Sequence, residues 1–105
     1  MKVEKELRRR LLDLTELAYE RELSHELAEL EAEFRRWRSG ETNAFDVSQA
    51  IHEFHQVVAR DLFSRYRPEN AEIVVAQAII RGIISNDEAG LAVMQHLAGH
   101  MRTLE

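Results

Sequence analysis

Hydrophobic residues recur every three or four positions through the first third of the chain, a spacing that places them on one face of a helix. They form two series: Val3, Leu7, Leu11, Leu14 and Ala18, then Leu23, Leu27, Leu30, Phe34 and Trp37. Residues 2–38 contain no Pro or Gly and are rich in Leu, Glu, Arg and Ala, which favour helices. The pattern predicts a long helix over residues 3–38.

The step between Ala18 and Leu23 is five residues, and two hypotheses explain it. Either the apolar face shifts within one continuous helix, as at a coiled-coil stutter, or the helix breaks, with Ser24 as an N-cap and Glu26 in the next first turn. We favour the continuous helix. It would be about 50 Å long, whereas a compact chain of this size has a radius of gyration of about 13 Å.

A helix of that length presents more apolar surface than one small domain can cover, so we expect a homodimer. The alternative is a monomeric bundle in which the helix folds back near Ser24. The residues that we expect at the dimer interface are Leu23, Leu27, Leu30, Phe34 and Ile79.

A second helix is predicted over residues 44–66, with Thr42 or Asn43 as its N-cap and Pro68 ending it. Its main apolar series is Val47, Ile51, Phe54, Val58 and Leu62, and a weaker series beside it is Phe45, His52, His55, Ala59 and Phe63. Two apolar series on one helix indicate that two of its faces are covered.

Residues 73–84, IVVAQAIIRGII, are the most apolar stretch of the chain. A bilayer requires about 20 apolar residues in a helix, so this stretch is too short to cross one. We expect it in a central helix over residues 69–84, because the stretch is too long for an ordinary strand and has no second strand to pair with. Ser85 and Glu88 have the spacing of a capping box, which predicts a fourth helix over about residues 88–102.

Together the patterns predict an all-α fold, a single bundle-like domain of four helices with the third at its centre. The 105 residues include four Gly and one Pro, fewer than an all-β fold would use. The absence of Cys excludes disulfides, thiolate zinc sites and cysteine catalysis. The N-terminal residues contain no apolar core of a signal peptide, so we expect a cytoplasmic protein with no membrane partner.

Two pairs of histidines offer a metal-binding alternative. His52 and His55 are three residues apart, and His96 and His100 are four apart, so each pair shares one face of its predicted helix. If the two helices were neighbours, the four imidazoles could form one site. The competing interpretation is that they are semi-buried polar residues beside apolar faces, and we favour it; we expect no cofactor.

Basic clusters offer a nucleic-acid alternative. Arg35, Arg36, Trp37 and Arg38 combine cations with an aromatic ring that could stack on a base. The formal net charge of −5 counts against it. So do the carboxylates at i,i+4 spacing, since pairs such as Glu31–Arg35 and Glu6–Arg10 would neutralise part of these clusters.

Catalysis has little support in the sequence. The carboxylates are scattered along exposed helix faces, and no Gly-rich phosphate loop or nucleophile elbow is present. We therefore expect a small non-enzymatic interaction module. Its partner-binding ridge is expected on the second helix, at His52, Glu53, His55, Arg60 and Arg65.

Overall fold

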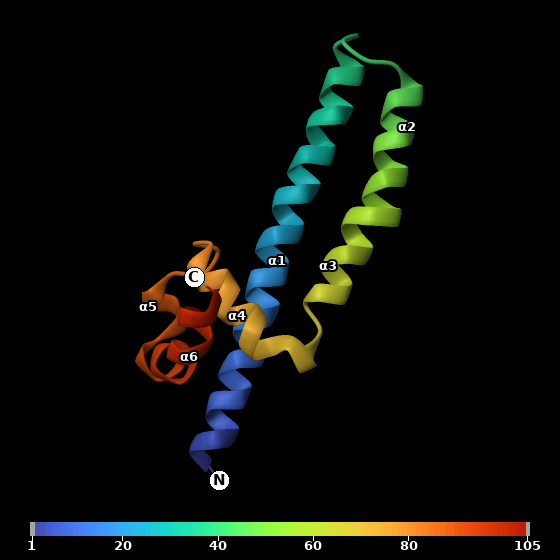
Figure 1. The fold of residues 1–105 in the computed structure, drawn as a ribbon. Helices are drawn as coiled ribbons and strands as arrows, with labels where there is room; N and C mark the ends of the chain where they lie inside the picture. The colour runs from blue at the N-terminus through green and yellow to red at the C-terminus, as the bar shows by residue number, and fades with distance from the viewer. Residues whose placement is uncertain (1, 105) are drawn as a thin grey trace. The chain divides into compact units, whose positions relative to one another are not determined.

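The computed structural model describes residues 2–104 and, among them, the side chains of residues 4–103. It confirms the all-α fold, because no strand occurs in this part of the chain. The elements (Figure 1) are α1 (Lys2–Arg38), α2 (Ala44–Glu53), the π-helix η1 (Phe54–Val58), α3 (Ala59–Arg65), the 3₁₀ helix η2 (Pro68–Asn70), α4 (Ala71–Ile80), α5 (Asn86–Ala89) and α6 (Leu91–Leu104).

The described chain divides into two compact units, and the single domain expected from the sequence stays a prediction. Unit 1 contains residues 2–21 and 65–104, and unit 2 contains residues 22–64. Helix α1 runs without interruption from one into the other, through Ser24. The continuous helix is therefore confirmed, and the alternative of a break at Ser24 is wrong.

Unit 1 holds most of the hydrophobic core, and α4 is at its centre. Most side chains of α4 are buried, as the apolar stretch predicted: Ala71, Val74, Val75, Ala76, Ala78 and Ile79. The N-terminal half of α1 contributes Leu11, Leu14 and Ala18, and α6 contributes Val93 and Leu97. This part of the fold follows directly from hydrophobic patterning.

Two glycines shorten the helices that the sequence predicted after Pro68. Helix α4 ends at Ile80 rather than at residue 84, because Gly82 adopts φ +78°, and the N–H groups of Ile83 and Ile84 both bond to the carbonyl of Ala78. The predicted fourth helix is likewise divided into α5 and α6 by Gly90, with φ +86° and ψ 158°. A residue with a Cβ is strained at such positive φ values, so these positions favour glycine.

The predicted capping box at the start of α5 is confirmed. The hydroxyl of Ser85 accepts from the N–H of Glu88 at 3.1 Å, and the carboxylate of Glu88 accepts from the N–H of Ser85 at 2.9 Å. Within the same unit, the rings of Tyr19 and Tyr66 stack with centroids 5.1 Å apart and an interplanar angle of 8°. The stacked rings join α1 to the residue that follows α3.

Unit 2 is an antiparallel helical hairpin, in which the C-terminal half of α1 lies beside α2 (Figure 1). Asn43 is the N-cap of α2, since its Oδ1 accepts from the N–H of Asp46 at 3.0 Å. The choice that the sequence left open between Thr42 and Asn43 is thereby settled. The loop between the two helices contains residues 39–43.

The predicted helix over residues 44–66 contains one wide turn, η1, in which the N–H of Ala59 bonds to the carbonyl of Phe54, five residues earlier. The reason lies in the apolar spacing. The steps from Ala50 to Phe54, Val58 and Leu62 are all four residues, and each such step drifts about 40° around a regular α-helix. A π turn holds one more residue than an α turn, so it returns the series to the less exposed side of the hairpin.

Candidate functional site

A groove of about 400 Å³ lies in unit 2, between the C-terminal half of α1 and α2 with η1. Its apolar lining is Leu30, Ala50, Phe54 and Val58, and its polar lining is Glu26, Glu29, Glu33, Asp46, Gln49 and Glu53. Among the residues that the structure describes, no Lys or Arg lines it. The groove therefore combines an apolar floor with an acidic rim.

The rim is only partly neutralised by neighbouring side chains. The carboxylate of Glu33 lies 3.1 Å from Nη1 of Arg36, and that of Glu29 lies 3.8 Å from Nε2 of His25. Within the described part of the chain, the carboxylates of Glu26 and Asp46 have no ion pair or hydrogen bond. The groove keeps a negative charge that a cationic partner would satisfy.

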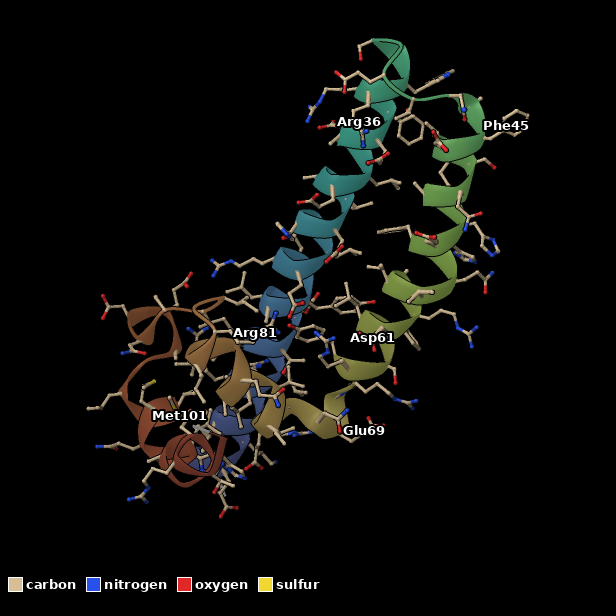
Figure 2. All side chains as sticks on the ribbon, turned by 45° about the horizontal axis from the view of Figure 1, so that its top comes forward. Arg36, Phe45, Asp61, Glu69, Arg81 and Met101 are labelled. Carbon is tan, nitrogen blue, oxygen red and sulfur yellow. The ribbon has the colours of Figure 1, made fainter. Side chains whose placement is uncertain are left out.

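Unit 2 buries little of its own apolar surface. Val47 and Leu62 are its buried hydrophobic side chains among residues 22–64. Three large side chains on α2, η1 and α3 are far more exposed: Phe45 at 84%, Val57 at 62% and Phe63 at 66%. Figure 2 shows Phe45 pointing away from the helix that faces it. Unit 2 therefore leaves large apolar side chains in solvent.

The residues expected at a dimer interface lie in both units. Leu23, Leu30 and Phe34 are half-buried in unit 2, and Leu27 is 46% exposed there. Ile79 is only 7% exposed and belongs to the core of unit 1. The four α1 residues are thus available to a partner to some degree, while Ile79 is covered by its own chain.

The residues expected to form a partner-binding ridge line different surfaces. His55 and Arg60 border a hollow with Phe63, whereas Glu53 lines the acidic groove and accepts from Nε2 of Gln49 at 3.2 Å. His52 is exposed on α2. Arg65 belongs to unit 1, where it borders a separate hollow with Gln77, Ile80 and Arg81.

The two histidine pairs belong to different units. His96 and His100 both approach one oxygen of Glu72, with Nε2–Oε2 distances of 3.2 and 3.9 Å, and His52 and His55 are exposed in unit 2. Nowhere in the described chain do three or more His, Asp or Glu side chains have an arrangement that could hold a metal ion. His96 is within hydrogen-bond distance of Glu72.

Two of the arginines near the end of α1, Arg35 and Arg36, form ion pairs with carboxylates. Nη1 of Arg35 lies 3.1 Å from Glu31, as the i,i+4 spacing predicted, and Arg36 contacts both Glu33 and Glu41. Trp37 is 41% exposed, and Arg38 is exposed at the helix end. The expected Glu6–Arg10 pair is not formed, because Arg10 instead donates to the carbonyl of Glu88.

Sequence reasoning did not find the acidic groove, although one signal for it was present. Glu26, Glu29 and Glu33 lie three and four residues apart around Leu30, which places them on one side of α1. That this side borders α2 rather than solvent depends on the hairpin, which spacing alone does not give.

No helix of the described residues has the length and apolarity needed to cross a membrane. No protein-family model matches the sequence, and no curated protein and no solved structure is detectably similar to it.

Proposed function

We propose that this protein is a small, non-enzymatic helical interaction module of the cytoplasm that associates as a homodimer in which the groove of unit 2 is filled by the partner. The observation that carries the proposal is the open groove with the apolar floor of Leu30, Ala50, Phe54 and Val58. A groove between two antiparallel helices is a common receptor for a third helix, whose apolar side chains enter between them.

The energetics of unit 2 favour such a partner. Fully burying one large apolar side chain contributes about 1.5–3 kcal/mol, and the floor side chains Leu30, Phe54 and Val58 are only half-buried in unit 2. Part of that free energy is recovered when another helix covers the hairpin. A second copy of the chain is the partner that is always available.

The test blocks the groove and measures mass in solution. Light scattering of the wild-type protein should give about twice the 12.2 kDa of one chain. Ala50 is half-buried in the groove, so Ala50→Glu should fill the floor with a charged side chain and give a monomer.

Ala92→Glu is the matched control, because Ala92 is an exposed helical alanine of α6 in unit 1. It should leave the mass unchanged. Far-UV circular dichroism should show that both variants keep their helices. A wild-type chain that is monomeric at every concentration would overturn the proposal.

A further inference from the structure

The acidic rim limits what can occupy the groove. If two copies met groove to groove, the carboxylates of Glu26, Glu29 and Asp46 would face the same carboxylates of the other copy. Like charges brought together in an interface oppose association. The acidic rim therefore favours a cationic surface, and a helix is the element that commonly lies in a groove between two helices.

The chain carries such a surface at the start of α1. A hollow of about 480 Å³ on this helix is lined by Glu4, Lys5, Arg8, Arg9, Leu12 and Asp13. Lys5 and Arg9 are exposed, and within the described residues neither has an ion pair or a side-chain hydrogen bond. Arg8 is exposed as well, and donates to the carbonyl of Pro68 at 3.2 Å. We call Lys5, Arg8, Arg9 and Leu12 the basic stripe.

The basic stripe matches the α1 side of the groove in length and in spacing. Lys5, Arg9 and Leu12 are separated by four and three residues, and Glu26, Glu29 and Glu33 by three and four. Each set spans two helical turns, about 10 Å. Half-buried Leu12 is the apolar side chain of the stripe and can enter the apolar floor.

We infer that the groove of one copy binds the basic stripe of a second copy. This inference rests on the proposed homodimer and names the segment that enters the groove. Each copy carries both the groove and the stripe, so a pair of chains offers the contact twice. The apolar floor supplies affinity, while the charges on the rim select the stripe and exclude a second groove.

Reciprocal charge reversal tests the inference. Lys5→Glu with Arg9→Glu makes the stripe acidic, and Glu26→Lys with Glu29→Lys makes the rim basic. Each double variant alone should raise the dimer dissociation constant about a hundredfold, about tenfold for each of the two groove–stripe contacts. An equimolar mixture of the two should form a heterodimer, because both of its groove–stripe contacts join opposite charges.

The design separates a specific contact from an effect of net charge. The first double variant makes the chain more acidic than its formal −5 and the second makes it less acidic, yet both should weaken the homodimer. Glu31→Lys with Glu41→Lys is the control, because these exposed residues of unit 2 lie outside the lining of the groove. Sedimentation equilibrium at low and high salt gives the dissociation constants, and circular dichroism checks folding.

The outcomes distinguish the inference from the proposed function. A wild-type monomer overturns both. In another outcome, the wild-type protein is a dimer, Ala50→Glu dissociates it, and both charge-reversed variants keep the wild-type dissociation constant. This result overturns the inference and supports the groove as the interface. Failure of the mixed variants to form a heterodimer also overturns the inference.

Discussion

Arg21 of α1 and Glu88 of α5 form a two-point ion pair within unit 1. Nη1 of Arg21 donates to Oε1 of Glu88 at 2.9 Å, and Nη2 donates to Oε2 at 2.5 Å. The same guanidinium donates to the carbonyl of Ile83 at 2.8 Å, and the same carboxylate accepts from the N–H of Ser85. One arginine thus joins α1 to the turn after α4 and to the cap of α5.

This arrangement predicts a loss of stability in acid. The hydrogen bonds from Arg21, and next that from the backbone of Ser85, lower the pKa of Glu88 from 4.5 to about 2. Because the folded state holds the carboxylate ionised, its contribution to stability is complete above pH 4.5 and is lost as the pH falls from there towards 2. Urea unfolding of the wild-type protein between pH 7 and pH 2.5 should follow this course.

Glu88→Gln is the control for the acid prediction. The amide cannot ionise, so this variant should be less stable than wild type at pH 7, and the difference should narrow as the pH falls below 4.5. If the two proteins differed by the same free energy across the whole range, the carboxylate would not be the source of the acid sensitivity.

Two glycines in unit 1 should respond to alanine in opposite directions. Gly90 adopts φ +86° and ψ 158°, a conformation open almost only to glycine, so Gly90→Ala should lower the free energy of unfolding by about 1–3 kcal/mol. Gly99 lies inside α6, and a Cβ there would have no atom within 4 Å. Gly99→Ala should therefore raise it by about 0.5–1 kcal/mol. Urea unfolding measures both, and a Gly90→Ala variant more stable than wild type would contradict the assignment of α5 and α6 as separate helices.

Deleting one residue would disturb a regular α-helix, but at the wide turn η1 such a deletion should be harmless. Removing exposed Gln56 leaves steps of four, three and four residues from Ala50 to Leu62, which a regular α-helix keeps on one face. We expect the deletion variant to retain its helicity and to match or exceed the wild-type free energy of unfolding.

Gln56→Ala is the companion variant, since it removes the side chain while keeping the chain length and the π turn. It should change stability by no more than about 0.5 kcal/mol, as expected for an exposed position. A deletion variant that lost helical circular dichroism, or more than about 2 kcal/mol of stability, would show that η1 is not an extra residue accommodated in an α-helix.

Patterning in the sequence predicted the elements better than their ends. The long α1, the buried α4, the cap at Ser85 and the hairpin loop all follow from helix periodicity and local hydrogen bonding. The π turn could not be predicted in this way. A helix can accommodate the drift of four-residue steps either by widening one turn or by leaving some of the side chains exposed. Likewise, Gly82 and Gly90 fit a helix pattern in the sequence until their φ values are known.

The candidate site was harder to predict than the fold, because it depends on which helix faces another. The sequence selected His52, Glu53 and His55 as one ridge, but neighbouring residues of a helix point in different directions, and Glu53 lines the groove that His55 does not. The apolar floor around Leu30 was recognised only as part of a long hydrophobic face. Its acidic rim becomes visible when α1 and α2 are placed side by side.

The stacked tyrosines give the two units separate optical reporters. The chain contains two Tyr, both in unit 1, and one Trp, Trp37, in unit 2. Near-ultraviolet ellipticity includes the stacked Tyr19 and Tyr66 rings of unit 1 together with Trp37, while emission excited at the red edge of indole absorption follows unit 2 alone. Unmodified protein can thus reveal whether its halves melt together or one after the other.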